Sequence, residues 1–361
     1  MNTLREVGDR FTVSVVVCTY NRSVQVAECV TSLLARSGEN FVVLVVDDGS
    51  TDDTQQQLGI VQAQHPTNSI IISRNPTNLG LSAARNVGIA AAGGDIILFT
   101  DSDCVVDPDW LRHMIAAFED PAAVAVAGVS LDHPPRTYAE AAYVGTNRLG
   151  VSPVQNRALV GNCMGFRQET LQTYGFDKAL TYYCDDDDLA WRLISDGHKI
   201  AFAPAAVVRH DHPMTVRKYL RMARLQGRGS GRFWYKQGKY VGRDILPTTL
   251  GLLTLPLGLL SVWLLLIPAF FASAQLAALV YNQHALKGKS LGTAVKVLPL
   301  EIAYSACKTA SVYFTLLRIA LGYEPEIVRS KREWWSRQKS RGDGRPAEGE
   351  GGEQLRDDGR G

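Results

Sequence analysis

Apolar and polar positions follow a repeating pattern through the first hundred residues. Runs of successive apolar, often β-branched residues predict buried strands, and they lie at residues 12–18, 41–46, 69–73 and 95–99. The segments between these runs show helical spacing of their apolar residues, and they lie at residues 24–36, 51–64 and 81–92. Strands that are apolar on both faces are typical of parallel sheets covered by helices. The pattern therefore predicts an α/β fold with a mostly parallel, doubly wound sheet.

The alternation continues less regularly as far as residue 214, and residues 131–159 show no clear period. The further elements that the pattern predicts are a helix at 110–118, strands at 122–129 and 161–167, a helix through Trp191 and Leu193, and short strands at 199–204 and 207–209. Residues 1–214 are thus expected to form one domain.

A long uncharged run, residues 245–281, changes the picture of the C-terminal third. It is too long for one membrane helix of about 20 residues, and Pro256 and Pro268 interrupt it. Lys and Arg flank it on both sides, which favours a location of both ends in the cytosol. Residues 245–284 are therefore predicted to form a transmembrane or re-entrant hairpin, with one long tilted membrane helix as the alternative.

The segments around this run are amphipathic. Residues 215–244 are basic and contain Phe233, Trp234 and Tyr235, which predicts a juxtamembrane segment against anionic membrane lipids. Residues 285–340 are expected to be interfacial and helical, and residues 341–361 to be a disordered tail. No signal peptide is apparent, so we expect an inner-membrane protein whose first domain lies on the cytoplasmic side.

Composition excludes several classes of protein. Apolar residues make up 46% of the chain and charged residues 20%, so general disorder is excluded. The net charge of +2 and the adjoining apolar run argue against a nucleic-acid partner. Six cysteines without a CxxC pair indicate a reducing compartment and small core residues, not a disulfide framework or a zinc site.

One acidic pair stands directly after the strand at 95–99. Asp101 and Asp103 would face the same side of an extended chain, and their repulsion would be relieved by a cation between them. Carboxylates together with phosphate oxygens and water suit Mg²⁺ or Mn²⁺. The alternative is an acidic turn that caps the next helix.

Polar clusters follow three of the first four predicted strands, at residues 19–22, 47–50 and 101–103. Ligands of such sheets bind at the carboxyl ends of the strands. The turn at 19–22 contains no glycine, and the chain has no GxxxxGK[ST] motif, which excludes a dinucleotide fingerprint and a P-loop.

Several of these pieces, taken in order over residues 12–212, resemble the family 2 glycosyltransferases of GT-A fold. The matching pieces are Val13-Ser14-Val15-Val16-Val17-Cys18-Thr19-Tyr20-Asn21-Arg22, Val46-Asp47-Asp48-Gly49-Ser50, Asn78-Leu79-Gly80-Leu81-Ser82-Ala83-Ala84-Arg85-Asn86, Gly94-Asp95 through Asp101-Ser102-Asp103, Asp185-Asp186-Asp187-Asp188-Leu189, and His210. The resemblance implies a GT-A domain followed by a hydrophobic helical membrane region, and inverting transfer of a sugar from a nucleotide diphosphate donor.

The resemblance also implies roles for particular residues. Those implied to bind the nucleotide are Cys18, Tyr20, Arg22, Asp48, Arg85 and Ser102. Asp48 could accept from a uracil N–H, or could instead cap a helix. Arg85 would approach the base or diphosphate, or could instead lie on a solvated helix face.

For the metal, the resemblance implies Asp101 and Asp103, the family's DxD motif, with His210 as a further ligand and His212 as a substitute for it. The general base would be Asp186, with Asp185 as the rival because four aspartates adjoin one another. Asn162 and Arg167 match a stretch that lines the donor sugar and the acceptor.

The expected function is transfer from a nucleotide-sugar, with a UDP-sugar favoured, to a lipid-linked or glycolipid acceptor. A non-catalytic nucleotide-sugar-binding scaffold is one alternative. A processive polysaccharide synthase is the other, but its Gln-x-x-Arg-Trp motif is replaced here by Gln226-Gly227-Arg228-Gly229.

Overall fold

The structure is a computed structural model, and it describes residues 11–35, 41–66, 70–144, 148–149, 159, 161–181, 183–238 and 245–340. The first strands are β1 (Val13–Thr19), β2 (Phe41–Asp47), β3 (Ile70–Arg74) and β4 (Ile96–Asp101). They pair in parallel in the order β3-β2-β1-β4. Within a residue or two at each end, these are the strands that the apolar runs predicted.

The sheet then becomes mixed. Beyond β4 come β8 (Met164–Arg167), β6 (Ala123–Asp132), β9 (Lys199–His210) and β5 (Cys104–Val106), while β7 (Arg148–Leu149) pairs with β6. β8 is antiparallel to both neighbours, β9 is parallel to β6, and β5 is antiparallel to β9. The predicted mostly parallel α/β sheet is therefore confirmed for the first half of the domain, with antiparallel additions in the second half.

β9 is one strand where the sequence predicted two. Its pairing with β6 passes from Ala127 opposite Phe202 to Val129 opposite Val207. The extra residues on β9 form a bulge that accommodates Pro204, which cannot donate to the ladder. The interruption that suggested two strands is thus an irregularity within one.

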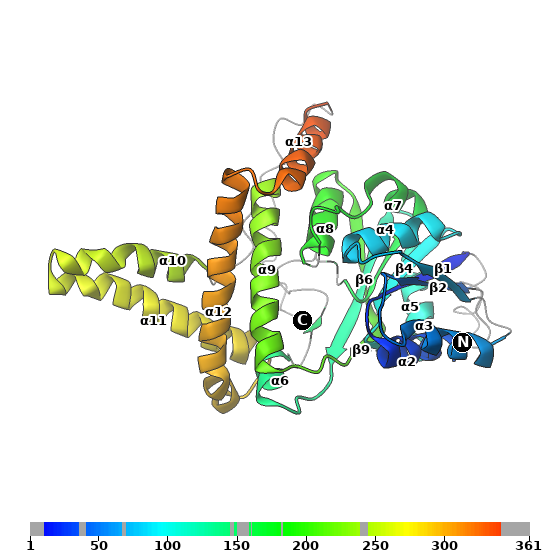
Figure 1. The fold of residues 1–361 in the computed structure, drawn as a ribbon, viewed down its shortest axis with the longest axis horizontal. Coiled ribbons are helices and arrows are strands. Elements are labelled where there is room, and N and C mark those ends of the chain that lie inside the picture. Colours follow the sequence, from blue (N-terminus) through cyan, green and yellow to red (C-terminus); the bar gives the residue numbers. More distant parts are fainter. Residues whose placement is uncertain are drawn as a thin grey trace, which may run out of the picture.

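Helices cover both faces of the sheet, as Figure 1 shows. On one face, Val15 and Val17 of β1 pack with α2 (Ser23–Leu34), α3 (Thr54–Gln64) and α5 (Trp110–Ala116). On the other face, Val16 packs with residues of α4 (Leu81–Ala91), α7 (Gln168–Tyr174) and α8 (Asp185–Ser195). Successive strand residues point to opposite faces, so one apolar strand supplies both cores.

The C-terminal part is helical. It comprises α9 (Val216–Gln237), α10 (Ile245–Thr254), α11 (Leu266–Tyr281), α12 (Leu291–Ala320) and α13 (Pro325–Ser340), and α6 (Tyr138–Tyr143) packs beneath it. α9 and α12 run side by side, and α10 and α11 form a hairpin that projects away from the sheet (Figure 1). α9 thus stands between the sheet domain and the apolar helices.

Among the described residues, the large apolar side chains with the highest exposed fractions lie in the hairpin. Leu259 is 90% exposed and Trp263 is 76% exposed, both near its tip. Within the described residues, one helical stretch, Trp263–Ala285, has the length and apolar composition to cross a membrane. The division of residues 215–361 into juxtamembrane, hairpin, interfacial and tail segments remains a prediction, and the predicted tail at 341–361 lies outside the described residues.

Candidate active site

The carboxyl ends of β1, β2 and β4 meet at one edge of the sheet, beside α9. A cleft of about 580 Å³ opens there. Five of the six residues predicted to bind a nucleotide line this cleft, namely Cys18, Tyr20, Arg22, Asp48 and Ser102. Arg221 and Leu225 of α9 line it as well. A second cleft of about 560 Å³ adjoins it and shares Arg22 and Asp101. The turns that the sequence placed at strand ends thus form one continuous site.

Asp48 is held by the loop that precedes α4. Its carboxylate accepts hydrogen bonds from Asn75 Nδ2 at 2.8 Å and from the backbone N–H groups of Leu79 and Gly80 at 3.0 and 2.9 Å. Asp48 therefore fixes the end of this loop but is not a helix N-cap, because the N-cap positions of α3 and α4 are Asp53 and Gly80. Asp47 is similarly committed, because its carboxylate accepts from the backbone N–H of Ser50 at 2.9 Å.

Asp103 is buried and lies among cationic groups. Its carboxylate forms an ion pair with Arg22, lies 3.3 Å from His210 Nε2, and contacts His212 Nδ1 at 3.1 Å. Burial opposes ionisation of Asp103, but contacts with His210, His212 and Arg22 hold its pKa well below the ordinary value. Asp103 is thus an anion whose charge is balanced inside the cleft.

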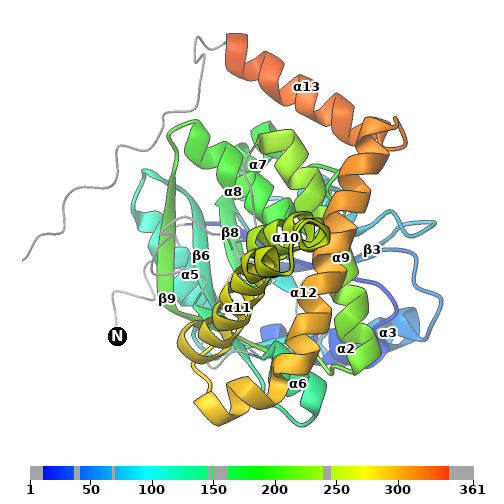
Figure 2. The same ribbon diagram turned by 90° about the vertical axis from the view of Figure 1, so that its left-hand side faces the viewer.

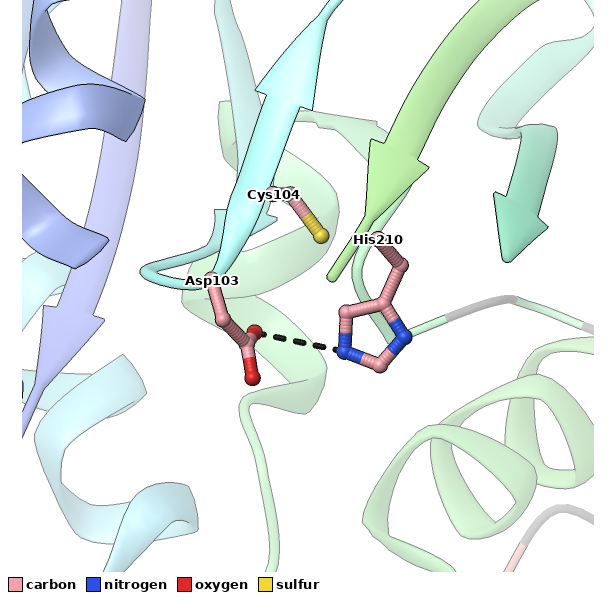
Figure 3. A group of neighbouring side chains, drawn as sticks. All are labelled: Asp103, Cys104 and His210. Atoms are coloured by element: carbon pink, nitrogen blue, oxygen red, sulfur yellow. Dashed lines mark ion pairs between the residues drawn. The ribbon is translucent and has the colours of Figure 1, made fainter. Parts of the chain in front are cut away.

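His210 carries the complementary charge. Burial alone would lower its pKa, but Asp103 and Asp132 stabilise the imidazolium and raise the pKa to about 9. β5 pairs antiparallel with β9 and sets Cys104 opposite His210, which brings His210 to Asp103 (Figure 3). The imidazolium form of His210 thus balances part of the negative charge of Asp103 and Asp132.

The carboxylates of Asp101 and Asp103 and the imidazole of His210 are ligand types that fit Mn²⁺ or Mg²⁺. Asp103 Oδ1 is buried yet makes no well-directed hydrogen bond to any described residue, so it can accept a cation. Ligating atoms of Asp103, Cys104 and His210 all lie within 4.8 Å of one another. Burial raises the pKa of the Cys104 thiol well above the ordinary value, and these ions prefer oxygen ligands, so Cys104 is a poor third ligand. Asp101 offers oxygen ligands and is 35% exposed in the cleft, but it is not part of this group and lies 3.4 Å from Arg85 Nη2, so its role as a ligand stays a prediction.

Arg85 is buried, which rules out the solvated helix face as its position. Its Nη1 lies 2.5 Å from Asp185 Oδ2, and its Nη2 lies 3.4 Å from Asp101 and 2.9 Å from the Gly161 carbonyl oxygen. Arg85 lines the second cleft and links Asp101 to the start of α8. Its guanidinium therefore positions these two acidic groups relative to each other.

The four aspartates at the start of α8 have different surroundings. Asp185 is buried against Arg85. Asp188 is fully buried and accepts from Arg192, Lys236 and Gln237. Both carboxylates are thus occupied by structural contacts that the sequence alone could not reveal.

Asp186 is partly buried, lines the second cleft, and accepts from the backbone N–H of Gly161 at 3.0 Å. Burial raises its pKa to about 8, with repulsion from Asp187 and Asp185 adding to the effect. Of the two candidates for a general base, Asp185 is paired with the Arg85 guanidinium, whereas Asp186 forms no ion pair with any residue that the structure describes. Its assignment as the base stays a prediction.

The two residues predicted to line the sugar or the acceptor lie at opposite ends of β8. Asn162 is buried in the second cleft, where its Nδ2 donates to Ser130 Oγ at 3.0 Å. Arg167 pairs with Ile96 at the start of β4, and its guanidinium donates to the backbone carbonyls of Phe118 and Ala123. The prediction for Arg167 was wrong, because the antiparallel direction of β8 carries it away from the cleft.

Sequence reasoning missed the wall that α9 contributes. Arg221, Met222, Leu225 and Gln226 line the two clefts, although they lie far from any strand end in the sequence. The only sequence signal was the helical spacing of the basic residues in this segment. Tyr143 of α6 completes the wall beside His212.

Comparisons with known proteins bear on the family and the fold of this chain. A sequence profile of the family described as "Glycosyl transferase family 2" matches residues 14–175, and one described as "Glycosyl transferase family group 2" matches residues 96–284. The computed structure is similar to that of the mannosyltransferase PcManGT from Pyrobaculum calidifontis, with a TM-score of 0.57 and 22% identity, over 83% of this chain and 87% of that one. This likeness concerns the fold.

Among curated relatives, the pre-mycofactocin glycosyltransferase of Mycobacterium tuberculosis is 32% identical over 58% of this chain and 44% of its own length. The glucosyl-dolichyl phosphate glucuronosyltransferase of Haloferax volcanii is 33% identical over 32% of this chain and 37% of its own. The chain therefore matches less than half the length of either relative. Because one family profile spans more than half of the chain, this protein belongs to the family 2 glycosyltransferases.

Proposed function

We propose that this enzyme transfers a sugar, with inversion, from a nucleoside diphosphate donor to a hydroxyl of a lipid-linked or glycolipid acceptor at the inner membrane. The observation that supports it most is the joining of two clefts that bring Asp101, Asp103 and Asp186 together. One cleft offers room for a nucleotide, and the other holds a carboxylate with raised proton affinity.

The donor assignment draws on the structural neighbours. PcManGT was solved with GDP-Man and Mn²⁺, and GalNAc-T7, at a TM-score of 0.50, was solved with UDP, GalNAc and Mn²⁺. A UDP-sugar is the donor to test first, with a GDP-sugar second. Asp101, Asp103 and His210 would hold Mn²⁺ or Mg²⁺, which when bound neutralises charge on a diphosphate leaving group.

The residues of the chain account for the remaining steps. Asp186 in its ionised form takes the proton of the acceptor hydroxyl as that oxygen bonds to the anomeric carbon. The bond from this carbon to the diphosphate oxygen breaks, and the nucleoside diphosphate leaves. Arg85 keeps Asp101 and the first turn of α8 in register throughout.

The acceptor and location are inferred from the helical part. The exposed apolar residues of the α10–α11 hairpin suit insertion in a bilayer. The basic residues on both flanks of the hairpin favour the cytoplasmic side for the active site. A membrane-bound catalytic domain would meet acceptors that are themselves in the membrane.

The proposal is tested by measuring donor hydrolysis and transfer with Mn²⁺ for the wild type and for Asp186→Asn. We expect donor binding to persist in Asp186→Asn while turnover falls by about 10²–10⁴-fold. Equal, near-zero turnover in both proteins with tight donor binding would instead identify a nucleotide-sugar-binding scaffold. Transfer to soluble acceptors as efficient as to lipid-linked ones would remove the support for a membrane acceptor.

A further inference from the structure

One face of α9 carries a row of arginines. Arg217, Arg221, Arg224 and Arg228 follow one another at steps of four, three and four residues, so they share one side of the helix. All four are exposed. We refer to them as the arginine row. Its spacing is that of a continuous helical face.

Most of this charge has no protein counter-ion. Among the described residues, Arg217, Arg221 and Arg224 form no ion pair. Arg228 contacts Glu324 at 3.2 Å, but Glu324 also pairs with Arg232 and Arg318 and so serves three cations at once. An unneutralised row of guanidinium groups is suited to bind phosphate, which it can contact with paired hydrogen bonds.

The arginine row lies between the active site and the apolar helices. On one side of α9, Met222, Leu225 and Gln226 line the clefts. On another side, Gly227 and Gly231 pack against the backbone of α12. The row occupies the face between these two, and Arg221 reaches the same cleft as Asp101 and Ser102.

The depth of the row relative to a bilayer follows from α12. This helix exposes large apolar side chains such as Phe314 (61%) and Leu317 (54%), next to the hairpin. Packed helices lie about 8–10 Å apart, and the headgroup layer is about 5–8 Å thick in each leaflet. With α12 at the membrane surface, α9 lies at the level where lipid phosphates are found. Figure 2 shows α9 directly behind α12 when the molecule is viewed from the hairpin.

We propose that the arginine row binds the phosphate or diphosphate of the lipid-linked acceptor and holds its sugar end in the cleft. This inference rests on the proposed function. The lipid chain would extend toward α12 and the hairpin, and the phosphate would contact Arg221 and Arg224. From Arg217 to Arg224 the row extends about 10 Å along α9. This is a longer stretch of the helix than the donor diphosphate in the cleft could contact.

The test uses the full-length protein in phosphatidylcholine nanodiscs and measures the binding of farnesyl diphosphate, a short isoprenoid diphosphate. The variant is the double substitution Arg221→Gln/Arg224→Gln. Its matched control is Arg329→Gln/Arg332→Gln, which removes the same charge from exposed positions of α13. Parallel measurements use dihexanoyl-phosphatidylglycerol and UDP with Mn²⁺ as ligands.

We expect the Kd for farnesyl diphosphate to rise about 25-fold in the double variant, about fivefold for each arginine, with no change in the control. The Kd for phosphatidylglycerol should stay unchanged, and the Kd for UDP should rise by no more than about fivefold, because only Arg221 of the two arginines also lines the nucleotide cleft. Unchanged farnesyl diphosphate binding overturns the proposal. So does an equal loss for phosphatidylglycerol, which would mark a surface for bulk anionic lipid, and so does a loss for UDP as large as that for farnesyl diphosphate, which would mark a donor contact.

The binding measurement contains no sugar donor and so does not depend on turnover. If the wild type transferred no sugar but its binding of farnesyl diphosphate required the arginine row, the proposed function would fail while the phosphate site remained. If transfer occurred but the double variant bound farnesyl diphosphate normally, only the phosphate site would fail.

Discussion

The raised pKa of Asp186 predicts a specific pH dependence of catalysis. A base must be ionised to accept a proton, and burial holds the pKa of this carboxyl at about 8. At pH 7 about one-tenth of the molecules would carry an ionised Asp186, and at pH 6 about one-hundredth. The value of kcat/KM should therefore rise about tenfold per pH unit up to about pH 8 and level off above it.

The cause of this shift can be tested by substitution. After burial, the charge of Asp187 contributes most to raising the pKa of Asp186. Asp187→Asn should therefore move the rising limb of the kcat/KM profile to lower pH and increase activity at pH 6. Asp109→Asn, which removes a carboxylate from an exposed position before α5, serves as the control and should leave the profile unchanged.

The same group affects stability with a defined sign. Below the model-peptide value of 3.8, Asp186 is protonated in both the folded and the unfolded state. As the pH rises toward 8, the unfolded chain ionises first, so the folded state loses stability, by at most about 6 kcal/mol. Asp186→Asn should thus raise Tm at pH 8 and leave it unchanged near pH 4, while turnover falls by about 10²–10⁴-fold.

These measurements have clear refuting outcomes. A kcat/KM profile that is flat from about pH 5 to pH 8 would show that Asp186 is not the titrating base. If the rising limb of the kcat/KM profile did not move in Asp187→Asn, repulsion between the carboxylates of Asp186 and Asp187 would not set the pKa of Asp186. Activity retained in Asp186→Asn but lost in Asp185→Asn would transfer the role of base to Asp185.

Three further predictions concern the metal, the α9 contact and the hairpin. Asp103→Ala should abolish Mn²⁺-dependent donor binding, measured by calorimetry, and undiminished binding would make the acidic turn a helix cap. Gly229→Ala should lower Tm and activity together, because a Cβ there would lie 2.7 Å from the Tyr183 carbonyl oxygen beside the α8 aspartates. Gly59→Ala, within a helix and with open space around it, should instead stabilise by about 0.5–1 kcal/mol, and equal effects of the two would contradict this steric argument. Deletion of residues 245–281 should release the protein from phosphatidylcholine vesicles in a flotation assay, and full retention would place the membrane contact elsewhere.

Much of the fold could be predicted from local sequence. Runs such as Val13–Thr19 and Phe41–Asp47 are apolar at most positions because both of their faces are buried, and such runs have few alternatives to a parallel strand. The turns after β1, β2 and β4 could be predicted to form one ligand-binding edge because strand direction alone puts them together. The short strand β5 escaped notice because three residues carry too little periodicity.

The individual site residues depended on contacts between distant segments. Asp103 and His210 are more than a hundred residues apart in the chain, and only the antiparallel pairing of β5 with β9 brings them within 3.3 Å. Arg167 could not be excluded from the site without the direction of β8. The sequence could not show that Asp48 anchors a loop, because this role depends on the backbone N–H groups of Leu79 and Gly80, which donate to its carboxylate.

The sequence by itself determined the α/β sheet, the edge of the sheet at which the candidate site lies, and the apolar character of the C-terminal helices, because periodicity and strand direction are local properties. Only the tertiary structure decided which aspartates at the start of α8 are paired with cations, while the role of Asp186 as the base stays a prediction. Asp185 is paired with Arg85 of α4. Asp188 is paired with Arg192, which lies one turn later in α8, and with Lys236 of α9. A carboxylate's proton affinity is set by burial and neighbouring charge, and these exist only once the chain has folded.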